Sequence, residues 1–159
     1  MLKSFYIFVI LIFINSCNNT ASSISQTNPE FDILNLDVVE KKLNIQSPID
    51  QFTKNLLIKW FENKIKLIGF NGIAVIDIFD YSELITVIDN GKKVDISFKF
   101  NVSINNSSIS HSNKKTFQGH VSSFDSIIGD FSLNDFDNVI QNTRIKVIRK
   151  FTEDLKSKI

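Results

Sequence analysis

The 159-residue chain contains only one cysteine, two histidines, two prolines and five glycines. A single cysteine excludes an intrachain disulfide framework and a zinc site built on cysteines. Two histidines leave little for metal binding or acid–base catalysis. The chain also has almost no net charge, because its 18 basic residues are balanced by 17 acidic ones. This balance argues against nucleic acid as the main partner, since nucleic-acid-binding domains usually carry a basic surplus.

Hydrophobic residues make up 43% of the chain, which is too much for a disordered protein. A chain of this length usually builds a single core, so we expect one domain. Its first residues have a different character. Lys3 precedes an unbroken apolar run over Phe5–Ile14. The run is too short to span a bilayer, which takes about 20 residues. It is typical of a secretory signal peptide, predicted here over residues 1–16.

The apolar run ends in Ile14-Asn15-Ser16-Cys17, and Cys17 is the sole cysteine. A structural cysteine would more often lie in a core, and a catalytic one would need a histidine partner. The four residues resemble the lipobox of bacterial lipoproteins. That resemblance implies that Cys17 carries acyl chains and becomes the first residue of the mature protein. Asn18 is not the aspartate of an inner-membrane retention signal, so we expect anchoring on the periplasmic face of the outer membrane.

Residues 17–30 are rich in Asn, Ser and Thr and show no apolar periodicity, which predicts a flexible tether. Residues 31–159 form the expected domain. Removal of residues 1–16 also removes Lys3, so the mature chain has equal numbers of acidic and basic side chains.

The first half of the domain is expected to contain a strand and a helix. Phe31–Val39 predicts a strand and Glu40–Gln46 a polar connector. Ser47, Pro48 and Asp50 form a typical helix start, with Ser47 as the cap and Gly69 as the stop. The predicted helix has a wide apolar face made of two stripes: Ile49, Phe52, Leu56 and Trp60, and beside them Leu57, Phe61, Ile65 and Ile68.

The middle of the chain reads as a series of strands. Gly72–Phe79 is nearly continuously apolar, which predicts a strand that is central in its sheet or covered on both faces. After a bend at residues 80–83, Leu84–Ile88 continues the pairing. Asp89-Asn90-Gly91 is a strong hairpin turn. Apolar residues then alternate with polar ones from Val94 to Ile104, followed by a predicted polar loop at Asn105–Asn113 and a returning strand at Lys114–Ser123.

A long helix is predicted at the C-terminus. Ser132 and Asp135 repeat the capping pattern. The residues that follow include six at helical spacing that form one stripe: Phe136, Ile140, Thr143, Val147, Phe151 and Leu155. Val139 and Ile148 widen this stripe. The predicted order is β-α-β-β-β-β-α. This order indicates an α+β fold with an approximately four-stranded, mostly antiparallel sheet and both helices on one face.

The sequence carries no recognisable catalytic motif. No P-loop, dinucleotide-binding, metalloprotease or nucleophile-elbow motif is present. His111 and His120 are best interpreted as ordinary loop and strand residues, because no carboxylate cluster stands beside them. Asp77 lies within an apolar strand and forms a candidate acidic pair with Asp80. The favoured interpretation is that Asp77 faces the open side of the sheet or bonds a neighbouring backbone, so no catalytic residue, metal site or cofactor is expected.

Three other features have both a plain and a functional interpretation. Trp60, the only tryptophan, is expected to pack in the core rather than to stack on a ligand. Lys92-Lys93 and Lys114-Lys115 are expected to be solvated strand edges. The alternative for the lysine pairs is a docking surface for acidic sugar phosphates or for a protein.

Residues 60–81 resemble a group of small proteobacterial lipoproteins without an assigned activity. Their pattern is a tryptophan, a basic residue, two glycines and a strand ending in aspartate, represented here by Trp60, Lys64, Gly69, Gly72 and Asp80. Lys64 replaces the more usual arginine, and Tyr81 stands where alanine is expected. The order of elements is also similar to that of the lipoprotein that plugs the lipopolysaccharide translocon. That second likeness is one of architecture, and fold does not give function.

The sequence thus predicts a non-catalytic, lipid-anchored envelope protein that docks a protein partner or helps assembly at the outer membrane. The alternative is a factor that handles lipopolysaccharide or lipid. An open sheet face lined by Lys99 and Lys114 would suit an anionic glycolipid, whereas exposed apolar side chains would suit a protein. A periplasmic hydrolase is the third class, and it would require a pocket that brings Asp77, Asp80 or a histidine together.

Overall fold

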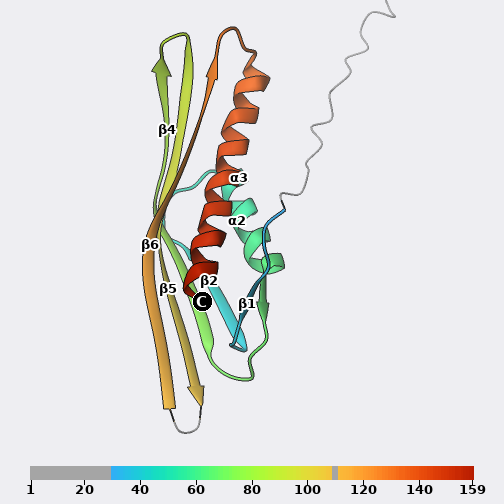
Figure 1. Ribbon diagram of the computed structural model, residues 1–159, viewed down its shortest axis with the longest axis vertical. Coiled ribbons are helices and arrows are strands. Elements are labelled where there is room, and N and C mark those ends of the chain that lie inside the picture. The colour runs from blue at the N-terminus through green and yellow to red at the C-terminus, as the bar shows by residue number, and fades with distance from the viewer. Residues whose placement is uncertain (1–29, 109–110) are drawn as a thin grey trace, which may run out of the picture.

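The computed structural model describes residues 30–108 and 111–159 and contains a four-stranded mixed sheet (Figure 1). The strand order is β2-β4-β5-β6, with β2 at Glu40–Ile45, β4 at Ile73–Ile88, β5 at Gly91–Ser108 and β6 at His111–Ile128. Strands β4, β5 and β6 form an antiparallel meander. The edge strand β2 runs parallel to β4.

Both helices pack on the same face of this sheet and leave the other face open (Figure 1). They are α2 at Gln51–Lys64 and α3 at Leu133–Lys158. Two short strands, β1 at Leu34–Leu36 and β3 at Ile65–Leu67, form a separate parallel pair. The predicted α+β architecture is confirmed. The observed order has one strand more than predicted, because two strands precede α2 and four lie between the helices.

The core lies between the sheet and the helices, and its centre is the ring of Phe151 in α3. The centroid of this ring lies 5.0 Å from Trp60 in α2, 5.3 Å from Phe98 and 4.8 Å from Phe100 in β5. All four side chains are fully buried. The predicted alternation in β5 is confirmed, since its inward side chains are buried: Val94, Ile96, Phe98, Phe100 and Val102. The core assignment of Trp60 is confirmed as well.

The start of α3 has the predicted capping box. The Ser132 hydroxyl accepts a hydrogen bond from the backbone N–H of Asp135 at 3.1 Å. The Asp135 carboxylate accepts one from the backbone N–H of Ser132 at 3.0 Å. These bonds satisfy two donors that a helix start otherwise leaves unpaired, and so fix where α3 begins.

The limits of α2 differ from the prediction. Its N-cap is Asp50, whose carboxylate accepts from the backbone N–H of Thr53 at 3.0 Å, and the helix ends at Lys64 rather than near Gly69. The ammonium of Lys41 in β2 donates to the carbonyls of Phe61 and Ile65, both at 2.7 Å. The carbonyl of Phe61, in the last turn of α2, and that of Ile65, which follows the helix, are thereby satisfied from outside the helix. Ile65–Leu67 is then free to pair with β1.

Three other predicted segments were wrong in extent. The stretch predicted as a polar connector forms β2, because an edge strand tolerates lysine and asparagine on its exposed side. The long strand predicted before it is reduced to Leu34–Leu36. The predicted polar loop at Asn105–Asn113 is mostly strand, since β5 continues to Ser108 and β6 begins at His111.

The strand β4 is central in its sheet, as predicted, but it is not covered on both faces. Ala74, Ile76 and Ile78 are buried under the helices, whereas the alternate residues are only half-buried on the open face. The predicted bend is a bulge with Asp80 at φ 52°. After it the strand continues to the predicted turn, where Asn90 adopts φ 56°.

Because Phe151 contacts rings from α2 and β5, its removal should loosen the attachment of both helices. We expect Phe151→Ala to lower the free energy of unfolding by about 3–5 kcal/mol in urea denaturation. Phe70→Ala serves as the control, because Phe70 is 99% exposed and its loss should change stability by no more than about 0.5 kcal/mol. Equal effects of the two substitutions would contradict the placement of the core.

Candidate functional site

The two aspartates singled out in the sequence have separate partners on the open face. The carboxylate of Asp77 accepts a hydrogen bond from the side-chain amide of Asn44 at 2.7 Å. The carboxylate of Asp80 forms an ion pair with the ammonium of Lys99 at 3.0 Å. Asp77 does face the open side of the sheet, but its partner is a side chain rather than a backbone group. Each acid is thus bonded to a partner outside the proposed acidic pair.

The histidines are also far apart. His120 is exposed on the open face of β6. His111 is the first residue of the same strand, and its side chain lies outside the described residues. Nine residues of extended strand separate their Cα atoms by about 30 Å. Within residues 30–108 and 111–159 no group of three or more His, Cys, Asp or Glu side chains is arranged to hold a metal ion.

Lys92 and Lys93 are half-buried and contact neighbours on the two faces of the sheet, rather than forming the predicted solvated edge. The Lys92 ammonium lies 4.7 Å from the centroid of the Phe136 ring, on the helix side. The Lys93 ammonium pairs with Asp95 at 2.8 Å on the open face and lies 4.7 Å from the Phe124 ring centroid. Successive strand residues point to opposite faces, so adjacent lysines do not converge on one anion. Lys114 and Lys115 are exposed, as predicted.

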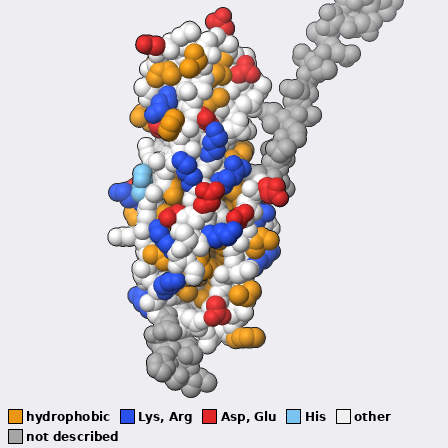
Figure 2. Space-filling model, in the orientation of Figure 1, with side chains coloured by type: hydrophobic (Ala, Val, Ile, Leu, Met, Phe, Trp, Pro, Cys, Tyr) orange, Lys and Arg blue, Asp and Glu red, His pale blue; other side chains and the backbone are white. Residues whose placement is uncertain are grey.

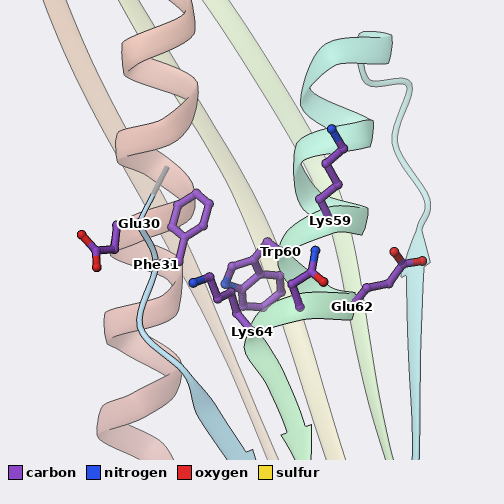
Figure 3. A pocket seen from close by; sticks show the side chains of 7 residues that line it. Glu30, Phe31, Lys59, Trp60, Glu62 and Lys64 are labelled. Atoms are coloured by element: carbon purple, nitrogen blue, oxygen red, sulfur yellow. The ribbon is translucent and has the colours of Figure 1, made fainter. Parts of the chain in front are cut away.

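A surface groove of about 800 Å³ lies at the C-terminal end of α2 (Figure 3). Seven residues line it: Glu30, Phe31, Lys59, Trp60, Glu62, Asn63 and Lys64. Figure 3 shows the carboxylates of Glu30 and Glu62 pointing in opposite directions. The indole ring of Trp60 forms the floor but is fully buried. The groove therefore does not bring its two acidic residues together.

The residues of the lipoprotein-like pattern hold positions that the backbone requires. A Cβ atom on Gly69 would lie 2.4 Å from the backbone of Asp37 and Val38. Gly72 has φ 87° and packs against the carbonyl of Asn105. Asp80 forms the bulge of β4. The pattern thus describes how the chain turns from α2 into β4, which is a structural role.

An ionic cluster that the sequence analysis missed connects β4, α2 and α3. Arg144 of α3 forms a bidentate pair with Glu83 of β4, with Nε–Oε2 and Nη2–Oε1 distances of 2.9 and 3.0 Å. Its Nη1 atom lies 3.4 Å from the carboxylate of Asp50, the N-cap of α2. The Tyr81 hydroxyl donates to Glu83 at 2.9 Å. The side chains of Arg144 and Glu83 are only 14% and 20% exposed.

Burial and charge together set the protonation of this cluster. Burial raises the pKa of Tyr81 to about 12, and the Glu83 carboxylate adds to that shift. Burial acts against the charged guanidinium, but the bonds and the charge of Glu83 outweigh it and raise the pKa of Arg144. For Asp50, burial is likewise outweighed by the hydrogen bonds from Thr53, which lower its pKa. The guanidinium of Arg144 thus stays charged beside Glu83, and Tyr81 remains a neutral donor.

One signal in the sequence could have indicated this cluster. The chain contains 16 lysines but only two arginines, Arg144 and Arg149. Arg144 lies beside Thr143 on the buried stripe of α3. An arginine next to a buried helix face, in a chain that otherwise uses lysine, is typical of a bidentate partner for a carboxylate.

The strongest candidate for a binding surface is at the end of the sheet that carries the β4–β5 turn. Three large apolar side chains on the open face are uncovered there: Leu84 is 58% exposed, Phe124 63% and Ile128 66%. Ile88 of β4 pairs with Gly91 of β5, which in turn pairs with Ile128 of β6, so that Ile88 and Ile128 flank the glycine on the same face. We call these four residues the open-face patch. Figure 2 shows hydrophobic side chains gathered at this end, in the upper part of the view.

Acidic side chains surround the same end of the molecule. Asp89 lies in the β4–β5 turn, Asp130 follows β6, and Asp137 lies in the first turns of α3, and all three are exposed. The nearby Lys93 is paired with Asp95. Acidic side chains also appear at this end in Figure 2. The end of the molecule that carries the open-face patch therefore also carries exposed acidic side chains.

No family model matches the chain, and no curated protein matches it. Among solved structures, it is similar to a minor lipoprotein from Acinetobacter baumannii, with 16% identity over 77% of this chain and 92% of that one, and a TM-score of 0.46. Rare lipoprotein B from Shewanella oneidensis is 11% identical over 75% of this chain and 95% of that one, with a TM-score of 0.48. Uncharacterized lipoprotein B from Nitrosomonas europaea is 5% identical over 80% of this chain and 88% of that one, with a TM-score of 0.43. These similarities concern the path of the backbone and assign no activity to this chain.

No helix within the described part of the chain is long and apolar enough to cross a membrane. Cys17 and the rest of the predicted signal and tether up to residue 29 lie outside the described residues.

The ionic cluster predicts unequal roles for the two arginines of α3. Arg144→Gln leaves Glu83 without its bidentate partner in a largely buried place, and we expect the free energy of unfolding to fall by about 2–4 kcal/mol. Arg149→Gln is the matched control, because Arg149 is exposed on the same helix and its loss should cost no more than about 0.5 kcal/mol. Urea denaturation of both variants tests this. A loss for Arg144→Gln as small as that of the control would show that the cluster does not stabilise the fold.

Proposed function

We propose that this protein is a lipid-anchored envelope protein without catalytic activity, which binds a protein partner through the open-face patch. One observation carries the proposal: Leu84, Phe124 and Ile128 are exposed on a sheet face that neither helix covers. Soluble proteins rarely expose neighbouring large apolar side chains unless the surface serves in binding.

The composition of the patch suits a protein interface. Phe124 has the large, rigid contact area that is frequent among residues that dominate binding energies. Covering the part of a side chain such as Leu84 or Ile128 that is still exposed is worth about 1–2 kcal/mol. The Lys93–Asp95 pair between them is already internally neutralised. A partner therefore meets apolar side chains without having to neutralise a buried charge.

The surrounding charge favours a particular partner. The exposed carboxylates of Asp89 and Asp130, in the segments that follow β4 and β6 at this end, complement a partner with basic residues beside an apolar centre. They would repel the phosphates of an anionic glycolipid. Lys99, one of the two lysines that could have favoured such a ligand, is paired with Asp80. The lipid-handling alternative therefore has less support than protein docking.

The anchor part of the proposal rests on the lipobox-like residues and on Cys17. Cys17→Ser removes the acceptor of the acyl chains, and we expect the protein to leave the membrane fraction after a salt wash. Asn19→Ser is the control, since it changes a neighbouring tether residue and should leave fractionation unchanged. Retention of the Cys17→Ser variant in the washed membranes would refute lipid anchoring at this residue.

The docking part can be tested by crosslinking in the intact envelope followed by identification of the captured proteins. We expect a specific protein to be captured by the native chain and by Phe70→Ser, and to be lost with Phe124→Ser. Both substitutions remove an exposed phenylalanine, but only Phe124 lies in the open-face patch. Recovery of lipid alone, or equal capture by both variants, would refute protein docking at this surface.

A further inference from the structure

The bulge at Asp80 divides β4 into two parts with different surroundings. The first part, Ile73–Ile78, lies between β2 and β5. The second part, Ser82–Ile88, pairs with β5 only. The last bond from the β2 side is donated by the backbone N–H of Gln46 to the carbonyl of Ile78 at 2.9 Å. The Ser47 hydroxyl then accepts from the backbone N–H of Tyr81 at 3.1 Å, and beyond that point the chain turns into α2.

The second part of β4 therefore has a free edge, and the turn defines which backbone groups lie on it. In a hairpin with a two-residue turn, the residues that flank the turn form a hydrogen-bonded pair, here Ile88 and Gly91. Pairs alternate along an antiparallel ladder between bonded and non-bonded. The N–H and C=O groups of Glu83, Ile85 and Val87 consequently point away from β5. No backbone hydrogen bond to these outward groups is present within residues 30–108 and 111–159.

The opposite edge of the sheet, along β6, is protected. The ammonium of Lys150 in α3 donates to the carbonyl of Ser122 in β6 at 2.9 Å and covers the edge there. The exposed Lys114 and Lys115 add charge further along the strand. Lysines at an edge are a common means of preventing strand addition. The free edge of β4 carries no lysine.

The side chains along the free edge are apolar or already paired. Leu84 is 58% exposed, Ile85 46% and Val87 79%. The only charged residue is Glu83, whose carboxylate is bonded to Arg144. A free edge of apolar, strand-forming residues without an unpaired charge is a template for another strand.

We propose that residues 83–87 of β4 pair antiparallel with the same residues of a second copy of this chain, around a two-fold axis at Ile85. In this register Ile85 faces Ile85 of the second copy, and Glu83 faces Val87. All outward groups of the five residues are then paired, which makes about six main-chain hydrogen bonds. The two four-stranded sheets become one continuous sheet across the axis.

Two properties of the edge favour a second copy over a different protein. The edge is self-complementary, because the outward groups are spaced symmetrically about Ile85. Since Glu83 is neutralised within its own chain, two copies approach without like-charge repulsion along the strand. The pairing also has natural ends, at Tyr81, whose N–H is already bonded, and at the Asp89–Asn90 turn. A two-fold contact of this kind is closed and stops at the dimer.

This inference does not depend on the proposed docking role. Three of the residues in the open-face patch lie away from the free edge, since Phe124 and Ile128 belong to β6 and Ile88 follows the paired segment. Only Leu84 belongs to both surfaces. A dimer formed at the edge would therefore leave Phe124 and Ile128 of each copy available.

Disulfide trapping distinguishes the proposed register from random collision. Cys17→Ser first removes the native thiol from the full chain, and Ile85→Cys or Val87→Cys is then added. Cα atoms of a bonded antiparallel pair lie about 5.5 Å apart, within the disulfide range of about 4.4–6.8 Å. In the same register the two copies of residue 87 lie four residues apart, or about 13 Å along the strand, which is too far for a disulfide. Random collision would favour residue 87, because Val87 is the more exposed of the two.

We expect oxidation to convert the Ile85→Cys chain into a covalent dimer and to leave the Val87→Cys chain monomeric. We also expect light scattering to give the Cys17→Ser chain twice the mass of a monomer. Crosslinking of both thiols to the same extent, preferential crosslinking at residue 87, or no crosslinking at either would overturn the proposal.

A second pair of variants separates the two surfaces. Ile85→Lys, in the Cys17→Ser background, places two positive charges opposite each other at the axis and should halve the mass measured by light scattering. Phe124→Ser should leave the dimer mass unchanged, even if it abolishes capture of a protein partner. A monomeric Phe124→Ser chain, or a dimeric Ile85→Lys chain, would contradict pairing at the β4 edge.

Discussion

The contact of Phe151 with Trp60, Phe98 and Phe100 is the interaction on which the remaining architecture depends. It joins α3, α2 and β5 at one point, so that both helices must lie on the same face of the sheet. A single core on one side leaves the other side without a cover. The open face is therefore a consequence of where the aromatic rings are placed, and its side chains are available for binding.

Arg144 extends this attachment towards the β4–β5 turn, where the aromatic core ends. Its bidentate bond to Glu83 holds the second part of β4 against α3 just beyond the bulge at Asp80. The arginine also approaches Asp50 at the start of α2. One side chain thus fixes the position of three elements. Because β2 ends before this point, the same arrangement leaves the edge of β4 ordered but unpaired.

The sequence predicted those elements whose local pattern agrees with their final environment. The alternation from Val94 to Ile104 and the capping box at Ser132 are of this kind. It failed for β2, because the polar residues of an edge strand resemble those of a connector. The open-face patch was equally hidden. Leu84 and Ile88 read as ordinary strand residues, and their exposure depends on which face the helices cover, a property of the tertiary structure alone.

The parallel pairing of β2 has a consequence for how the domain forms and opens. Glu40 pairs with Ile73 across the whole of α2 and β3, whereas Ile88 and Gly91 are joined by a two-residue turn. Contacts that close a long stretch of chain carry a larger entropic cost and form later than local ones. We therefore expect the meander and α3 to form before β1 and β2 join them. A pulling force that arrives from the N-terminal side therefore acts on β1 and β2 before it reaches the antiparallel meander.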